Sequence, residues 1–295
     1  MRCCVIFNPA AKGDKARHFL DRLKSARDGV EFVPTKGPGD ATKLAAEMVA
    51  KGHETIVAAG GDGTVNEVAN GLLRAGNSRV RLGVLPLGTV NVFAKELGIP
   101  TSIDGAWTVL ERGRERRLDA GWVEHAVEGV LQRRYFVQLA GAGLDARAVE
   151  LVTWENKKRY GALAYVLAGW RALGEELAQI RVESDGQQVE GAELVLVGNG
   201  KFYGGRWRVF PDAAMDDGLL EVTVFRRLSR FWLPLYGLAA LTGGWGIAPG
   251  VRRFRARELS LSNVGNAAFE LEGDWAGTLP IRIGIEPKAI RVMAP

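Results

Sequence analysis

Residues 60–67 read Gly-Gly-Asp-Gly-Thr-Val-Asn-Glu, and the apolar run Thr-Ile-Val-Ala-Ala at residues 55–59 leads directly into them. A β-branched run, a glycine turn and a helical pattern in this order predict a strand, a tight loop and a helix. The glycines allow positive φ values and let a ligand approach the main chain, and Thr64 can cap the helix. Unpaired N–H groups at such a helix start suit a phosphate. A plain strand-to-helix connection is the alternative.

The first third of the chain repeats this alternation of apolar runs and helical patterns. Alternation of this kind is typical of βαβ units and predicts a parallel sheet with helices on both faces. The expected strands are residues 3–8, 30–34, 55–59 and 81–85. The expected helices are residues 14–27, 40–51, the helix that ends near residue 75, and 90–97.

Loops that follow parallel strands lie on one edge of the sheet, where open α/β sheets bind ligands. Four such loops, at residues 8–13, 35–41, 60–67 and 86–89, carry N–H groups, hydroxyls and amides. One nucleotide can contact several of them. Asp62 would repel a phosphate directly, so we expect it to act through Mg²⁺ or a ribose hydroxyl.

After residue 117 the chain changes to short strands separated by glycine or polar turns, which predicts a β-sandwich-like second domain. One long helix is expected at residues 157–177. The expected domains are residues 1–123 and 124–295, with the last strand able to return to the first domain, and we expect them to meet in a cleft. The expected strands are residues 134–140, 179–183, 193–198, 219–225, 258–261, 267–271, 279–285 and 289–293.

The composition limits which cell compartment and which classes of partner are expected. A chain of 295 residues is long enough for two domains, and a net charge of +5 favours anionic partners. The only cysteines, Cys3 and Cys4, are adjacent in an apolar strand and are expected to be buried, inert thiols in a reducing cytoplasm. The N-terminal segment lacks the pattern of a signal peptide.

Residues 231–251 contain no charge and lie between arginine clusters at 226–230 and 252–257. Pro234, the Gly243-Gly244 pair and later glycines argue against one membrane-spanning helix and favour a short helix. Its aromatic and aliphatic residues fit either a protein core or a lipid-facing surface. The arginines are candidates for contact with anionic headgroups.

Known nucleotide and metal motifs are missing: there is no P-loop, no Gly-x-Gly-x-x-Gly after the first strand, and no metal-like spacing of the three histidines. Other motifs occur in a consistent order along nearly the whole chain, which resembles the diacylglycerol kinase catalytic-domain family, the soluble bacterial lipid kinases related to sphingosine kinases. These motifs are Asn8-Pro9, Thr35, residues 60–67, residues 86–91, Gly198-Asn199-Gly200, Tyr203-Gly204-Gly205, residues 211–219 and Leu271-Glu272-Gly273-Asp274.

The resemblance implies an NAD kinase/phosphofructokinase-like α/β nucleotide domain and a β-sandwich domain, in an enzyme that transfers the γ-phosphoryl group of ATP to a lipid hydroxyl. It implies that ATP is held by Asn8, Pro9, Lys12, Thr35, Gly61, Asp62, Gly63, Thr64, Glu67 and Thr89. It also implies a Mg²⁺ that orders a loop through Ala214, Asp217 and Leu219. Asp62 and, as an alternative, Asp119 are the candidates for the catalytic Mg²⁺.

The general base is expected in residues 272–274, where the acids are exchanged relative to the Asp-Gly-Glu of similar kinases. Asp274 matches the proton acceptor by position, and Glu272 is the alternative. Val92 is a second departure, since many relatives have aspartate there. The glycine of residues 8–13 is displaced as well. A polar hairpin turn without a catalytic role remains the alternative for residues 272–274.

The expected partners are a lipid substrate and an anionic membrane surface, contacted peripherally from the cytoplasm. Three other functions stay open: a catalytically impaired nucleotide- or lipid-binding regulator, a kinase of a soluble substrate such as NAD, and, more remotely, nucleic-acid binding, for which no recognition motif is present. A homodimer is also open, because an edge strand of a sandwich can pair between chains.

Overall fold

The computed structural model describes residues 2–9, 29–77, 79–152, 162–205, 207–263, 265 and 267–295. The chain forms two compact units. Unit 1 comprises Met1–Ala120 and Pro287–Pro295, and unit 2 comprises Gly121–Glu286. The expected helix at residues 14–27 and Lys12 in the loop before it lie outside the described residues.

Unit 1 is built on a parallel sheet in the order β2 (Val30–Pro34), β1 (Cys3–Phe7), β3 (Thr55–Gly60) and β4 (Arg81–Pro86). Every residue of β1 and β3 is buried, which explains why these strands are continuous apolar runs. The C-terminal end of β16 (Ile281–Ala294) adds to β4 in parallel through Arg291 and Val292.

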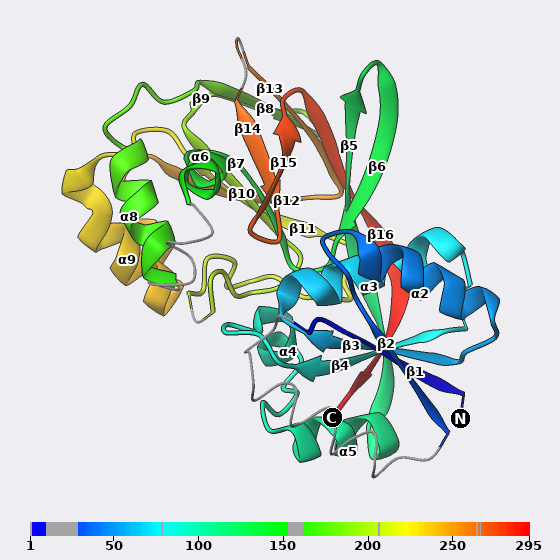
Figure 1. The fold of residues 1–295 in the computed structure, drawn as a ribbon. Coiled ribbons are helices and arrows are strands. Elements are labelled where there is room, and N and C mark those ends of the chain that lie inside the picture. Colours follow the sequence, from blue (N-terminus) through cyan, green and yellow to red (C-terminus); the bar gives the residue numbers. More distant parts are fainter. Residues whose placement is uncertain are drawn as a thin grey trace. The chain divides into compact units, whose positions relative to one another are not determined.

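Helices cover both faces of this sheet. α2 (Asp40–Ala50) and α3 (Asp62–Ala75) lie on one face and α5 (Ile103–Arg112) on the other, while α4 (Val92–Glu96) is a single short helix after β4 (Figure 1). α2 and α3 pack closely because Gly71 has no side chain: a Cβ there would lie 2.4 Å from the carbonyl oxygen of Thr42. The N-terminal α/β prediction is confirmed.

Unit 2 contains two antiparallel sheets, as predicted. The first has the order β12 (Val251–Ala256), β11 (Leu220–Phe225), β10 (Leu194–Gly198), β7 (Leu139–Gly143), β14 (Ala268–Leu271) and β15 (Asp274–Thr278). The second has the N-terminal half of β16, β13 (Glu258–Asn263), β8 (Ile180–Ser184) and β9 (Gln187–Ala192). Val182 and Leu259 of the second sheet share one core with Val195 and Phe269 of the first.

Two long strands belong to both units. β5 (Arg114–Val127) pairs with β6 (Val130–Phe136) and with β16, and β16 is a single strand where the sequence predicted two, at residues 279–285 and 289–293. Conversely, the strand predicted at residues 134–140 is divided between β6 and β7. The sequence patterns did not reveal β5, β9, β12 or β15, which contain many polar residues on exposed faces.

Helices of unit 2 lie outside the sheets. They are α6 (Leu144–Leu151), α8 (Ala162–Ala172), the 3₁₀ turn η1 (Arg230–Trp232), α9 (Leu233–Thr242) and the 3₁₀ turn η2 (Trp245–Ile247). α8 ends at Ala172, earlier than predicted. The uncharged stretch folds into a short helix flanked by 3₁₀ turns, as expected, and no described helix is long and apolar enough to cross a membrane.

The two cysteines are buried in β1, as the sequence predicted. Burial raises the pKa of Cys3 to about 11 and that of Cys4 to about 12. Because the thiolate is the reactive form, both thiols are inert at neutral pH.

Candidate functional site

The carboxyl ends of four parallel strands of unit 1 line up at one edge of the sheet. Phe7 lies opposite both Pro34 and Ala59, and Gly60 lies opposite Pro86. Main-chain bonds continue beyond the strands, from Thr35 N to Phe7 O (2.9 Å) and from Asn8 N to Ala59 O (3.2 Å). The loops that carry Asn8, Pro9, Thr35, Gly61 and Thr89 therefore begin at the same edge.

The glycine turn differs in detail from the prediction. None of Gly60, Gly61 and Gly63 has a positive φ, and Gly61 itself is the N-cap residue of α3, with φ −89°. Thr64 lies inside the first turn of the helix, so its predicted role as the cap is wrong. The helix starts at Asp62 because the main chain of the preceding residue, Gly61, has an extended and not a helical conformation.

Close approach explains the glycines instead. A Cβ on Gly60 would lie 2.4 Å from Thr64 Oγ1, and a Cβ on Gly88 would lie 2.4 Å from the Cα of Gly61. The turns after β3 and β4 therefore touch main chain to main chain, an arrangement that a side chain at either contact would prevent.

Asp62 connects these two turns. Its Oδ1 accepts a hydrogen bond from the N–H of Phe93 (3.1 Å) at the start of α4. Asn91, with φ 54°, closes the second turn by bonding Gly88 through both ends of its amide (2.9 and 3.0 Å). Oδ2 of Asp62 has no hydrogen bond to any described residue, so one carboxylate oxygen fits a bond to Mg²⁺.

Glu67 holds the start of α2. Its two carboxylate oxygens accept from Gly39 N (2.8 Å) and Ala41 N (3.1 Å), and its carbonyl accepts from the Thr42 hydroxyl (2.9 Å). A carboxylate at a helix N-terminus satisfies orphan N–H groups and complements the helix dipole. The role that the structure gives Glu67 is therefore to join α3 to α2, next to the loop that contains Thr35.

Two other positions named by the sequence lie inside the protein. Asp119 is fully buried and accepts a hydrogen bond from the N–H of Lys288 (2.7 Å), which ties β5 to the returning strand β16. Val92, the first residue of α4, is 7 % exposed and packs in the core, so the position that often holds an aspartate is apolar here.

The turn between β14 and β15 separates the two exchanged acids. Glu272, at φ 57°, turns its Oε1 into the protein, where it accepts the N–H groups of Val137 and Gln138 at 2.7 Å each. Asp274 is exposed at the start of β15, and no described residue hydrogen-bonds or ion-pairs with its side chain. Of the two candidate bases, Asp274 is the accessible one.

The segment that binds Glu272 is itself braced. The Asn199 amide donates to Val137 O (2.8 Å), the Gln138 amide donates to Phe202 O (3.0 Å), and Asn199 N donates to Gln138 O (2.8 Å). A Cβ on Gly200 would lie 2.4 Å from the Gln138 amide nitrogen. The Gly198-Asn199-Gly200 motif therefore supports the turn. The strand predicted at residues 134–140 is interrupted at Val137 and Gln138. The N–H groups of both residues and the carbonyl of Val137 bond to the side chains of Glu272 and Asn199 instead of to a neighbouring strand.

The carboxylate of the predicted Mg²⁺ loop is already paired with a positively charged side chain of the protein. Oδ1 of Asp217 accepts from Leu219 N (3.0 Å), and Oδ2 pairs with the Arg255 guanidinium. With both oxygens engaged, Ala214, Asp217 and Leu219 do not fit a metal in this arrangement. The described residues also contain no cluster of acidic, histidine or cysteine side chains suited to a metal ion.

Sequence reasoning missed a pair of facing acids next to the turn, one fully buried (Glu270) and one half-buried (Asp145). Asp145 of α6 and Glu270 of β14 face each other, and the Tyr203 hydroxyl donates to Asp145. Burial and then repulsion by Asp145 raise the pKa of Glu270 well above its usual range. The available signal was a lone glutamate in the apolar strand Ala-Phe-Glu-Leu.

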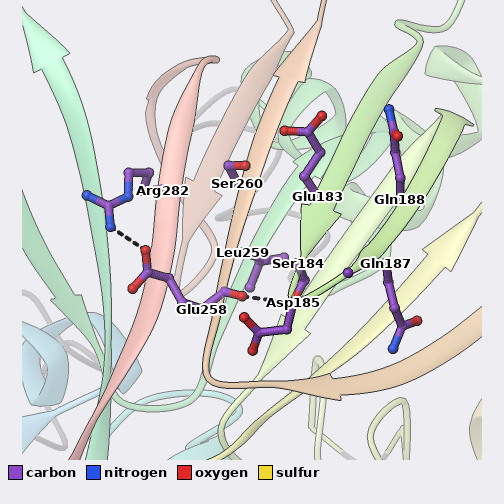
Figure 2. A pocket seen from close by; sticks show the side chains of 10 residues that line it. Glu183, Ser184, Asp185, Gln187, Gln188, Glu258, Leu259, Ser260 and Arg282 are labelled. Atoms are coloured by element: carbon purple, nitrogen blue, oxygen red, sulfur yellow. Dashed lines mark hydrogen bonds and ion pairs between the residues drawn. The ribbon is translucent and has the colours of Figure 1, made fainter.

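A hollow of about 690 Å³ lies elsewhere in unit 2, over the β8–β9 hairpin, β13 and β16 (Figure 2). Its walls include Glu183, Asp185 and the Glu258–Arg282 ion pair. Acidic and amide side chains around an open surface suit neither a nucleotide phosphate nor an acyl chain, and none of the residues predicted for the site lines it.

Comparison with known proteins agrees with this architecture. The model of the Diacylglycerol kinase catalytic domain matches residues 2–123, and that of the YegS C-terminal NAD kinase beta sandwich-like domain matches residues 138–294. A diacylglycerol kinase of Staphylococcus aureus (strain bovine RF122 / ET3-1) is 30% identical over 300 residues, which cover 100% of this chain and 92% of that protein. A diacylglycerol kinase of Staphylococcus saprophyticus is 30% identical over 285 residues, 95% of this chain and 90% of that protein.

Solved structures show the same fold. A diacylglycerol kinase from Bacillus anthracis str. Sterne matches with a TM-score of 0.76 and 23% identity, over 100% of this chain and 97% of that one. Yeast NADH kinase complexed with NADH matches with a TM-score of 0.59 and 11% identity, over 100% of this chain and 84% of that one.

The family models and the curated relatives, which agree with the observed two-unit fold, show that the protein is a kinase, a phosphotransferase of a family that uses a nucleotide. The chain belongs to the diacylglycerol kinase family, whose members are lipid kinases.

Proposed function

We propose that this protein transfers the γ-phosphoryl group of ATP to the hydroxyl of a diacylglycerol-like lipid at the cytoplasmic surface of the membrane. The observation that carries the proposal is the edge of unit 1 where Asp62 joins two glycine turns and has one carboxylate oxygen that bonds to none of the described residues. Loops of this kind offer main-chain N–H groups to phosphates. Asn8, Pro9, Lys12, Thr35, Gly61, Gly63, Thr64 and Thr89 belong to the proposed ATP site.

Asp274 is the proposed general base. The acceptor hydroxyl attacks the γ-phosphorus, its proton passes to the Asp274 carboxylate, and the bond between the γ-phosphorus and the bridging oxygen breaks to release ADP. Mg²⁺ held by Asp62 would neutralise charge on the phosphates. Glu272 keeps the turn in place because both of its short hydrogen bonds go to main-chain N–H groups.

An apolar face on unit 2 supports action at a membrane. We define it by exposed side chains of α8, η1, α9 and η2: Leu167, Trp170, Phe231, Leu238, Leu241 and Ile247. Phe231 is 78% exposed. Arg230 joins two of these elements, since its guanidinium lies 5.2 Å from the Trp170 ring centre and donates to the Trp170 carbonyl (3.1 Å).

Charge around the apolar face matches an anionic bilayer. Arg171, Arg226 and Arg230 are exposed, and Arg171 and Arg230 directly neighbour Trp170 and Phe231 in the chain. Aromatic side chains with arginines are typical of interfacial binding. The second arginine cluster differs from the expectation, because Arg253 is paired with Asp212 and Glu221 and Arg255 with Asp217. We assign headgroup contact to the first cluster only.

Transfer of radiolabelled phosphate tests the activity. The protein is incubated with γ-labelled ATP and Mg²⁺ and vesicles that contain diacylglycerol, monoacylglycerol, phosphatidylglycerol or a sphingoid base, with NAD as a soluble acceptor in parallel. We expect label in an extracted lipid. Label in NAD alone, or ATP binding without any transfer, would contradict the proposal.

Sedimentation with vesicles tests the membrane face separately. The double variant Phe231→Ser, Leu241→Ser is expected to lose binding to vesicles that contain anionic lipid. The matched control is Val130→Ser, Leu131→Ser, since these residues of β6 are 63% and 65% exposed away from the apolar face. Equal binding by both double variants would exclude the assigned surface.

A further inference from the structure

Two carboxyl groups meet in the interior of unit 2, above a glycine. A Cβ on Gly141 of β7 would lie 2.5 Å from Asp145 Oδ2 and 2.7 Å from Glu270 Oε1. Gly141 is also the strand partner of Glu270. The missing side chain of Gly141 therefore leaves the space in which the two acids face each other.

Hydrogen bonds connect this acid pair to its surroundings on both sides. The Tyr203 hydroxyl donates to Asp145 Oδ1, and Gly273 N donates to Glu270 Oε2 (2.6 Å). Glu270 is fully buried, and its Oε1 has no partner among the described residues other than the facing carboxyl of Asp145. One oxygen of Glu270 thus holds the turn and the other faces an acid.

Glu270 is fully buried and Asp145 is half-buried, and two carboxyl groups that face each other there cannot both be ionised without a large cost, so one keeps a proton. Burial and repulsion from Asp145 raise the pKa of Glu270 well above its usual range, and Glu272 adds further repulsion. Burial also raises the pKa of Asp145, while the bond from Tyr203 opposes that rise. β7 and β15 place only the uncharged Gly141 and Trp275 opposite Glu270.

We propose that Glu270, in its neutral form, is a positioning residue for the proposed base Asp274. Its carboxyl proton is donated to Asp145, and its other oxygen holds the Gly273 N–H, which fixes the turn between Glu272 and Asp274. The inference rests on the proposed function only in naming Asp274 as the base. The acid pair and its bond to the turn are a property of unit 2 alone.

Glutamine is a close mimic of the neutral acid, which makes Glu270→Gln the decisive variant. Its amide oxygen can accept from Gly273 and its amide N–H can donate to Asp145, but it cannot ionise. Glu270→Ala removes both bonds. Glu183→Gln is the control, since Glu183 is exposed on β8 of the other sheet.

Unfolding measured between pH 5 and pH 8 tests the shared proton. Because the pKa of Glu270 is raised in the folded state, its contribution is fully present below the unfolded-state pKa and is lost as pH rises toward the folded-state pKa. The unfolding temperature of Glu270→Gln should therefore exceed that of the wild type by an amount that grows with pH. For Glu183→Gln we expect a difference in unfolding temperature from the wild type that does not change with pH. The same pH-independent difference for Glu270→Gln would contradict the proposal that the two acids share a proton.

Hydrogen exchange and kinetics test the positioning. Exchange at the Gly273 amide should remain slow in Glu270→Gln and become fast in Glu270→Ala. In the phosphate-transfer assay, Glu270→Ala should lower kcat roughly 10- to 100-fold with little change in KM for ATP, and Glu270→Gln should restore kcat. Fast exchange or low kcat in Glu270→Gln would overturn the proposal. If the wild type phosphorylates no lipid, the proposed function fails, and the exchange and unfolding results still decide the role of Glu270.

Discussion

The carboxylate of Asp62 accepts a hydrogen bond from the main-chain N–H of Phe93, with an Oδ1···N distance of 3.1 Å. This bond joins the glycine turn after β3 to the start of α4. Asp62 therefore has a structural role on one oxygen, and its other oxygen, which bonds to no residue in the described part of the chain, is left for the proposed Mg²⁺. The two roles can be separated by substitution.

Asp62→Asn keeps the acceptor for Phe93 and removes the charge. We expect an unfolding temperature close to that of the wild type and a loss of phosphate transfer on the order of 100-fold, because a neutral amide is a poor ligand for Mg²⁺. Asp62→Ala should lose activity and also about 1–2 kcal/mol of stability, since the Phe93 N–H loses its partner. Full activity in Asp62→Asn would contradict the assignment.

Asp274→Asn should lower kcat by about 10²- to 10⁴-fold without changing the unfolding temperature, as expected when an exposed general base is removed. Glu272→Gln keeps an acceptor oxygen for Val137 and Gln138 and should retain most activity. Glu272→Ala should destabilise by about 1–3 kcal/mol through its unpaired N–H groups. An inactive Glu272→Gln beside an active Asp274→Asn would reverse the two roles.

Gly88→Ala should destabilise unit 1 by roughly 1–3 kcal/mol, because its Cβ would press on the main chain of Gly61 and force the two turns apart. Urea unfolding measures the effect, and ATP binding should weaken with it. The control is Gly169→Ala in α8, where a Cβ meets nothing within 4 Å. That change should stabilise the helix by about 0.5–1 kcal/mol. Equal stability of the two variants would show that the turns can separate freely.

Arg255 occupies the place where the family resemblance puts a Mg²⁺ ion, so added Mg²⁺ should not raise the unfolding temperature of the nucleotide-free wild type. Arg255→Ala leaves Asp217 without its cation, and Mg²⁺ should then stabilise the variant. Arg252→Ala, which loses a hydrogen bond to Gln187 and leaves the pair of Asp217 and Arg255 intact, is the control. A wild type stabilised by Mg²⁺ as strongly as Arg255→Ala would show that the metal displaces the guanidinium.

Local patterns were sufficient to predict most of unit 1. Apolar runs such as β1 and β3 and the amphipathic helix α2 appear in the chain as periods of hydrophobicity, and parallel order follows from their alternation. Polar strands were harder, since β5 begins with four exposed charged residues and three of the six residues of β12 are arginines, and both strands owe their form to pairing, with β16 and β11 respectively. Pairing energy overrides a weak local preference.

The sequence predicted which residues belong to the candidate site but not which hydrogen bonds they form. The sequence singled out Asp62, Glu67, Glu272 and Asp274. In the structure the carboxylates of Asp62, Glu67 and Glu272 accept hydrogen bonds from main-chain N–H groups that lie 26 to 135 positions away in the chain. It also brings together Asp145 and Glu270, which no local pattern connects.

Local sequence patterns specify the alternating α/β unit, the glycine turns at its strand ends and the short-stranded second unit, because hydrophobic period and glycine placement act over a few residues. Which acid is held by hydrogen bonds, and which one has no partner among the described residues, depends on long-range contacts that form when the chain folds. That choice depends on partners such as Val137 for Glu272 and Arg255 for Asp217, which chain folding brings within hydrogen-bonding distance and which neighbouring residues do not specify.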